Sequence, residues 1–409
     1  FSTWGGILIP FVLIEAIDLV NNDEGKFNWI GLGTVVAVVA QVHLLTTVLC
    51  VLTLIPFFVY GLYQSNYKKI LWLNLLKAIV LFMVLTANIW GTFALLYSTN
   101  HVSATFAYPL TSTAITVGLV SVWNTILDSI IVLFFVQLCY IVTNFKESKL
   151  NNLFTIEGLV FLFLSSQLFP WSIIENKFPI LKSTFQFPNR LTTIAYPLLF
   201  AAIGITISEL SKKYDKNIVN LARLALVGII LSNLSANYLF TDHRVKENSI
   251  GEVTLQKYVD DHISMPSEYL PIQKDMPSDE IHNNEANIIN PDVNKNFNKE
   301  VLKGGRLKLS WYSKKKEVIL LPIFMYHQSE LQFNNKKLDP NVNPIGMPFV
   351  MSEVGKNTAI LSFNTPGWLT ILLIISLISW LGVITLKIIS KFSKSFNIES
   401  LTLSKRKKV

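Results

Sequence analysis

The sequence predicts a mainly α-helical, polytopic membrane bundle of about nine spans, with a β-rich α+β domain inserted before the last span. Hydrophobic residues make up 51% of the 409 residues and charged residues only 15%, whereas soluble domains carry about 25% charged residues. The run 370–386 has no charged residue, and the run 43–63 has only a histidine. A polar segment, 241–365, separates the last apolar run from the others.

Apolar runs long enough to cross a bilayer set the predicted spans, because the ~30 Å hydrocarbon core requires about 18 or more apolar residues. The second run is short, and we expect it to form a tight hairpin with the third around 41–43. The predicted spans are 4–20, 28–41, 43–63, 72–97, 118–144, 151–168, 190–210, 218–240 and 366–390.

Basic residues predict the orientation, because Lys and Arg concentrate in short cytoplasmic loops. The loop 98–117 has neither, and the loop 169–189 has only Lys177 and Lys182. This pattern predicts a membrane protein with a cytoplasmic C-terminus and an extracytoplasmic segment 241–365. It also places Phe1 outside, so we expect further spans upstream. The frequent Asn, Lys and Ile residues indicate a bacterial source, and hence a bacterial cell membrane. The basic loops contain Lys26, Lys68, Lys69, Lys146, Lys149, Lys212, Lys213, Lys216 and the tail 405–408.

The predicted domains are a helix bundle over 1–240, an extracytoplasmic β-rich domain over 241–365, a terminal span over 366–390 and a basic tail over 391–409. Within 241–365, we expect a helix at 253–263 and an Asn-rich loop at 276–300. Strands are predicted at 306–313, 317–326 and 358–364, with a hairpin turn at 334–337. The simplest expectation is a small β-sandwich without chemistry of its own.

Several classes of function lack support in the sequence. There is no phosphate-binding Walker motif, no dinucleotide-binding glycine pattern and no nucleophile elbow. The two cysteines, Cys50 and Cys139, are too few for a disulfide framework. The histidines are scattered, so no metal site is predicted. The basic tail beside a span indicates topology, so no nucleic-acid partner is expected.

Polar groups inside spans are costly and are therefore functional candidates. Asp128 lies mid-span, with Asn124 at helical spacing. Asp128 would line a polar cavity, pair with a cation or hydrogen-bond to a neighbouring helix. Lys77 is close enough to one end of its span to extend to the membrane surface. His43 opens a span at the predicted outer hairpin, either as a satisfied polar group or facing a cavity.

The outer loop 167–190 combines three prolines with several aromatic residues. Its aromatic residues suit an interfacial helix at the level of the lipid headgroups. Arg190 follows at the outer mouth of the next span. Its guanidinium would either bind a lipid phosphate through two hydrogen bonds or extend to ordinary headgroups. The aromatic residues are Trp171, Phe178, Phe185 and Phe187.

Short motifs in this order resemble bacterial multi-pass proteins of the YfhO-like type, some of which are labelled 6-pyruvoyl-tetrahydropterin synthase-related. The motifs are "SSQLFPW" at 165–171, "FQFPNRL" at 185–191, "HLLT" at 43–46 and "SEYLP" at 267–271. The strand-rich stretch that leads into the last span adds to the resemblance. Asn189 stands where the family signature has Trp, but Arg190 is retained.

Such proteins are similar to the GT-C superfamily of membrane glycosyltransferases. The resemblance implies a polyprenyl-phosphate-linked sugar donor, with a cell-envelope glycopolymer or glycolipid as the acceptor and membrane lipid as a further partner. It implies that Arg190 and Lys182 bind the donor phosphate. Asp128, Asn124, His43, Trp171 and Gln186 would line the cavity.

The family's catalytic carboxylate lies in an outer loop near the N-terminus, a loop that we expect to precede Phe1. No catalytic residue is therefore assigned. No cofactor is expected either, unless that loop supplies a site for a divalent cation. The alternative function is a non-enzymatic lipid transporter or envelope-assembly protein. A channel has less support, because the spans lack charged rings or a repeated filter.

Overall fold

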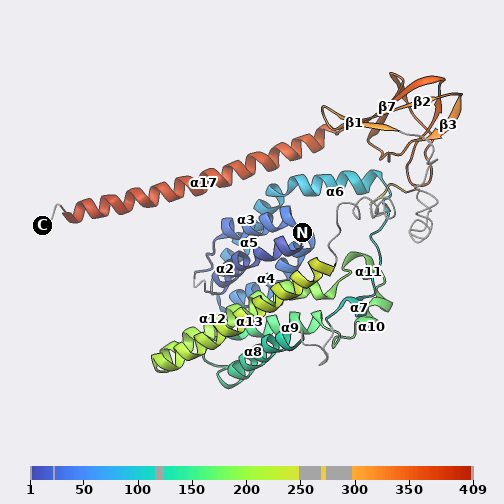
Figure 1. Cartoon of the computed structure of the whole chain (residues 1–409). Coiled ribbons are helices and arrows are strands. Elements are labelled where there is room, and N and C mark those ends of the chain that lie inside the picture. Colours follow the sequence, from blue (N-terminus) through green and yellow to red (C-terminus); the bar gives the residue numbers. More distant parts are fainter. Residues whose placement is uncertain (1, 22–23, 116–123, 248–268, 273–296, 407–409) are drawn as a thin grey trace. The chain divides into compact units, whose positions relative to one another are not determined.

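The computed structural model describes residues 2–21, 24–115, 124–247, 269–272 and 297–406 (Figure 1). It is mostly helical, at 63%, with a small antiparallel sheet region, which confirms the mainly α class. The chain forms two compact units. Unit 1 comprises Phe1–Thr86, Ala107–Glu252 and Ser379–Val409, and unit 2 comprises Ala87–Phe106 and Val253–Ile378.

Helices occupy most of unit 1, and several begin at a short polar side chain that accepts a backbone N–H. Asn28 accepts from Gly31 at 3.0 Å, and Ser148 accepts from Asn151 at 3.3 Å. The helices are α1 (Ser2–Ile7), α2 (Ile9–Val20), α3 (Trp29–Val42), α4 (Leu44–Gln64), α5 (Lys68–Leu85), α7 (Leu110–Thr113), α8 (Asn124–Thr143), α9 (Lys149–Ser165), α10 (Trp171–Lys177), α11 (Leu181–Thr184), η1 (Pro188–Leu191), α12 (Thr192–Lys213) and α13 (Lys216–Glu247).

Helices lie at all nine predicted span positions, but fewer meet the length and composition needed to cross a membrane. Among the described residues, three do so: Leu44–Gln64, Pro188–Lys213 and Gly367–Ile389. A fourth is added if α5 and α6 (Ala87–Thr99), which are separated by a break at Thr86, count as one span. The structure therefore supports three or four candidate spans, and the nine-span bundle stays a prediction.

Two side chains compensate for the break after α5. Because the helix stops at Leu85, its carbonyl loses the partner that a continuing helix would supply. Gln41 Nε2 donates to this carbonyl at 3.2 Å, and Trp380 Nε1 donates to it at 2.9 Å. One donor comes from α3 and the other from α17 (Gly367–Arg406), so the break is held by two helices that are distant in sequence.

Two helix crossings in unit 1 depend on glycine. A Cβ at Gly61 of α4 would lie 2.2 Å from the carbonyl oxygen of Leu19 in α2. A Cβ at Gly158 of α9 would lie 2.7 Å from Leu199 Cγ in α12. Figure 1 shows α9 and α12 side by side, and they pack extensively against each other. Close approach at these glycines lets the backbones form one continuous hydrophobic core.

Unit 2 contains α6, the strands and the start of α17. All strand pairings are antiparallel, with a five-stranded sheet in the order β1-β2-β7-β4-β5 and a two-stranded sheet of β3 and β6. The strands are β1 (Asn298–Leu302), β2 (Arg306–Ser313), β3 (Glu317–Leu320), β4 (Ser329–Phe333), β5 (Lys336–Leu338), β6 (Phe349–Ser352) and β7 (Gly355–Phe363).

The two sheets share one hydrophobic core, as the alternating sequence of β2 predicts. Leu309 and Trp311 of β2 point into it and pack with Ile319 of β3 and Val350 of β6. The predicted hairpin turn is confirmed, because β4 and β5 pair directly across it. Asn334 (φ 46°) and Asn335 (φ 67°) both adopt left-handed backbone angles, as a tight two-residue hairpin turn requires.

Some predictions fall outside the described residues. The helix expected at 253–263 is one, and the Asn-rich loop is described only from 297, where β1 follows at Asn298. The strand predicted at 317–326 is shorter in the structure, where β3 ends at Leu320. Pro322 lacks a backbone N–H and cannot continue a strand ladder, which accounts for the early end.

The α2–α4 crossing gives a test of this packing. Gly61→Ala is expected to destabilise the protein by about 2 kcal/mol or more, because the new methyl group would overlap a backbone carbonyl. Gly204→Ala is the matched control, since a Cβ there meets nothing within 4 Å. Thermal unfolding of the purified protein in detergent would measure both. Equal melting temperatures for the two variants would contradict the predicted crossing.

Candidate functional site

Two loop segments of unit 1 are joined by hydrogen bonds and carry several predicted site residues. The backbone N–H of Tyr108 donates to the Lys182 carbonyl at 3.0 Å, and Thr113 Oγ1 donates to the Gln186 carbonyl at 2.8 Å. Glu175 accepts the backbone N–H of Leu110, the first residue of α7, at 2.6 Å. The segment 108–115 therefore fixes the predicted outer loop 167–190 from one side.

Arg190 lies at the end of this loop with its charge unpaired. Its guanidinium carbon lies 4.4 Å from the centre of the Phe187 ring, and Nη1 makes a long 3.5 Å contact with the Phe185 carbonyl. The side chain is half-buried. Within the described ranges, no carboxylate forms an ion pair with it. A half-buried cation without a counter-ion favours binding of an anion.

Phe187 and Tyr108 support the guanidinium. The Phe187 ring stacks obliquely on Tyr108, with 5.0 Å between the ring centres. Phe187 is thus held between the other loop segment and Arg190. Because a cation over an aromatic face keeps a preferred position, the pair restricts where the guanidinium can lie.

His43 lies close enough to Arg190 for the two groups to interact electrostatically. It caps α4, since its Nδ1 accepts the backbone N–H of Thr46 at 3.2 Å and lies 2.8 Å from Thr46 Oγ1. A ring nitrogen that accepts an N–H carries no proton, so in the neutral ring Nε2 carries it and can donate. His43 is therefore both a satisfied helix cap and a hydrogen-bond donor near Arg190.

Helix α1 is fitted closely against this region. A Cβ at Gly5 would lie 2.9 Å from Thr46 Oγ1, and a Cβ at Gly6 would lie 2.8 Å from Thr193 Cγ2. Thr46 follows His43 in α4, and Thr193 follows Arg190 in α12. The two glycines thus let α1 approach both of the helices that carry the candidate residues.

Lys182 and Gln186 lie in the same loop but play different parts. The half-buried Lys182 ammonium has no hydrogen bond or ion pair within the part of the chain that the structure describes. The backbone of Gln186 is left-handed, at φ 60°, and its carbonyl is held by Thr113. This turn directs the chain from α11 into η1 and Arg190.

The structure places Trp171 in the interior, whereas the sequence suggested an interfacial position. The side chain is 7% exposed, and its Nε1 donates to the Leu164 carbonyl at 2.9 Å. Its ring contacts Phe169 and Phe185, with 4.8 Å and 5.7 Å between ring centres. The expected interfacial helix is divided into α10, α11 and η1, because Pro179 and Pro188 interrupt helical hydrogen bonding.

The candidate pair Asn124 and Asp128 is not tested. Both lie in the first turns of α8, where the backbone is described but the side chains are outside the described residues. No metal centre was predicted, and among the described residues no three His, Cys, Asp or Glu side chains are grouped closely enough to hold an ion.

A buried polar network that the sequence analysis did not identify joins α8, α9 and α12. Gln137 Nε2 donates to Asn151 Oδ1 and to Thr155 Oγ1, both at 2.9 Å. Asn151 Nδ2 donates to Thr206 Oγ1 at 2.8 Å, and Thr206 Oγ1 donates to Gln137 Oε1 at 2.9 Å. The four side chains hydrogen-bond to one another, which makes the arrangement specific.

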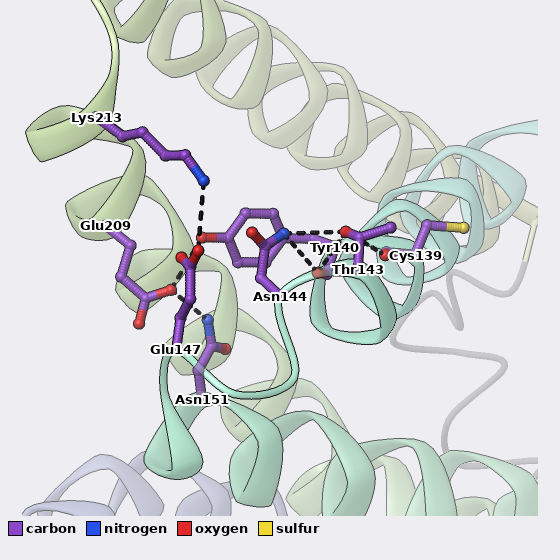
Figure 2. A network of polar contacts seen from close by, with 8 residues as sticks. All are labelled: Cys139, Tyr140, Thr143, Asn144, Glu147, Asn151, Glu209 and Lys213. Carbon is purple, nitrogen blue, oxygen red and sulfur yellow. Dashed lines mark hydrogen bonds and ion pairs between the residues drawn. The ribbon is translucent and has the colours of Figure 1, made fainter.

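The network continues toward the ends of these helices (Figure 2). Glu209 accepts from Tyr140 OH at 3.0 Å and from Asn151 Nδ2 at 3.2 Å. Beyond it, Lys213 pairs with Glu147 at 3.3 Å on the exposed rim. The sequence signal was Gln137 inside an apolar run, since a polar side chain in a span is costly unless it is hydrogen-bonded.

No family model, curated protein or solved structure matches the chain.

The polar network gives a second test. Asn151→Leu is expected to cost about 1–3 kcal/mol for each buried group that loses its partner, chiefly Gln137 and Thr206. Replacing Gln137, Asn151 and Thr206 together by Met, Leu and Val is expected to recover much of the loss, because no orphaned partner remains among the three. Thermal unfolding in detergent measures both. A triple variant less stable than Asn151→Leu would contradict this account.

Proposed function

We propose that this chain is a bacterial membrane glycosyltransferase-like protein that uses a polyprenyl-phosphate-linked sugar donor to modify a cell-envelope glycopolymer or glycolipid. The observation that carries the proposal is the Arg190 guanidinium, held over Phe187 without a carboxylate partner among the described residues. No catalytic carboxylate is assigned to the described residues.

The side chains of Arg190, Lys182 and His43 have donor groups that suit a phosphate. Arg190 offers a planar fork of donors, Lys182 a second cation, and His43 a further N–H. Arg190 has no counter-ion among the described residues, and a bound anion would supply one. A phosphate diester is the anion that a lipid-linked sugar donor carries.

An apolar groove in unit 1 would accommodate the lipid part of the donor. The groove has a volume of about 410 Å³ and is lined by side chains of α2, α3, α4 and α5, including Val51, Leu62, Trp72 and Phe82. Val51 lies eight residues after His43 on the same segment, about 12 Å along a helix. A lipid bound along α4 would bring its phosphate toward His43.

The loop contacts support the proposed orientation. Lys213 and Glu147 join two of the loops predicted to be cytoplasmic. Tyr108 and Lys182 join the two poorly basic loops predicted to be outside. If α8, α9 and α12 span the membrane, loops on the same side should contact each other, as these two pairs do. The β-rich segment would then lie outside, and the C-terminus would lie in the cytoplasm.

Arg190→Ala is expected to weaken binding of polyprenyl phosphate by roughly tenfold or more, since a charge-assisted hydrogen bond contributes about 1.5–3 kcal/mol. Arg190→Lys should retain part of the affinity. Lys177→Ala is the matched control, because Lys177 is another cation over a ring, 5.7 Å from the centre of Phe178. Binding would be measured in lipid nanodiscs, and envelope sugar content in cells that carry each variant. Unchanged sugar content with Arg190→Ala would reject the transferase.

A second candidate function, proton-coupled lipid transport, is favoured by Glu157. This α9 side chain is 7% exposed, and neither carboxyl oxygen has a hydrogen-bond partner among the described residues. Phe154 and Phe161, one turn to either side, are buried in the same helical core. Unpaired carboxyl groups in such surroundings are costly and are characteristic of proton relays.

For transport, Glu157→Gln is expected to abolish proton-dependent movement of a fluorescent phospholipid in proteoliposomes. Glu147→Gln is the control, since Glu147 is exposed and lies outside the core. If wild-type protein moves no lipid, or if Glu157→Gln moves it equally fast, transport is rejected and Glu157 is left as a packing residue.

A further inference from the structure

Unit 2 contains a groove that the proposed donor site does not use. It has a volume of about 680 Å³, within the range of small-molecule sites. Its walls come from three elements: the end of α6 at Leu95 and Thr99, the β4–β5 hairpin, and Pro366 with Trp368 at the start of α17. The groove therefore combines a polar hairpin with an aromatic residue that begins a candidate membrane span.

α6 and α17 are packed closely enough to form a fixed wall. A Cβ at Gly91 of α6 would lie 2.8 Å from Leu372 Cδ1, and Ser376 Oγ donates to Asn88 Oδ1 at 3.1 Å. The β4 side is joined to α6 by Gln328 Nε2, which donates to Thr99 Oγ1 at 2.6 Å. These contacts fix all three walls within unit 2.

The charges of the groove disfavour an anion. Lys337 is already paired with Glu330 at 3.0 Å, and Asn364 Nδ2 lies 3.4 Å from the same carboxylate. Asp339 adds a second carboxylate to the lining. A phosphate placed here would meet two negative groups and one cation that is already neutralised.

Three lining side chains have no partner in the described part of the chain. The His327 ring, the Asp339 carboxylate and the Trp368 indole N–H make no hydrogen bond or ion pair there. Trp368 is 45% exposed. The Asp339 carboxylate can therefore accept hydrogen bonds, the His327 ring can both donate and accept them, and Trp368 offers an aromatic face. Several hydroxyl and amide groups lie in the same lining.

We propose that this groove binds a short neutral saccharide. Sugar hydroxyls both donate and accept hydrogen bonds, which matches Asp339, His327 and the Asn364 amide. The C–H face of a sugar ring suits the exposed indole of Trp368, an amphipathic side chain with an apolar surface and a polar tip. This inference goes beyond the proposed transferase, because it uses no residue of the donor site and stands whether or not sugar is transferred.

The saccharide has two possible sources, a glycolipid headgroup or a soluble glycan. Trp368 is the second residue of the candidate span Gly367–Ile389, and tryptophan at a span end favours the headgroup level of a membrane. A glycolipid in the bilayer would therefore present its sugar beside the groove, whereas a soluble glycan would enter from the aqueous side.

Full-length protein in phosphatidylcholine nanodiscs, purified without sugar-based detergents, would test the site. Maltose is titrated by calorimetry, and nanodiscs that contain diglucosyl diacylglycerol are analysed by native mass spectrometry. Trp368→Ala and Asp339→Asn are each expected to weaken binding at least tenfold. The matched controls, Tyr312→Ala on β2 and Glu300→Gln on β1, should leave it unchanged, since neither residue lines the groove.

If both probes bind, the site recognises the sugar whether or not it is attached to a lipid. If the lipid probe binds and maltose does not, the ligand is a glycolipid headgroup. Arg190→Ala should leave either result unchanged, which separates this site from the donor site. Absence of saturable binding of both probes would overturn the proposal. So would displacement of either probe by inorganic phosphate, or wild-type affinity in both groove variants when thermal unfolding shows that they are folded.

Discussion

The packing of α9 against α12 is the constraint on which the rest of unit 1 depends. The loop that carries Lys182 and Arg190 leaves the end of α9 and returns at the start of α12, so these two helices fix both of its ends. Gly158 permits the close approach, and the buried amide and hydroxyl groups of the polar network set its register. If the two helices slid past each other, the side chains of the network would lose their hydrogen-bond partners.

The candidate site shows how a fold can hold positive charge without neutralising it. Arg190 is supported by an aromatic ring and a carbonyl, and neither cancels its charge. The carboxylate of the same loop, Glu175, accepts a backbone N–H at the start of α7. Glu175 is therefore engaged in a structural hydrogen bond, whereas Arg190 and Lys182 have no carboxylate partner among the described residues. The groove in unit 2 has the opposite arrangement, with its cation paired and one carboxylate unpartnered.

The sequence predicted the positions of the helices and the hairpin well, because apolar runs and paired asparagines act locally. It predicted β2 to its exact ends, since Leu309 and Trp311 alternate with polar residues. It did not predict that Trp171 is buried, because both an interface and a core suit an aromatic residue. It missed Gln137, Asn151 and Thr206, whose partners are separated by up to 69 residues, a pairing that no local pattern encodes. The position of His43 near Arg190 is non-local for the same reason.

The carbonyl of Leu85 has a consequence for how the chain is made. One of its two side-chain donors, Gln41, is synthesised before it, but the other, Trp380, follows 295 residues later. At ribosomal rates of about 5–20 residues per second, this interval lasts about 15 to 60 s. During that time the Leu85 carbonyl lacks the hydrogen bond from Trp380. The contact at Leu85 is therefore completed only once α17 has been synthesised, so this part of the fold matures long after α3 and α5 have left the ribosome.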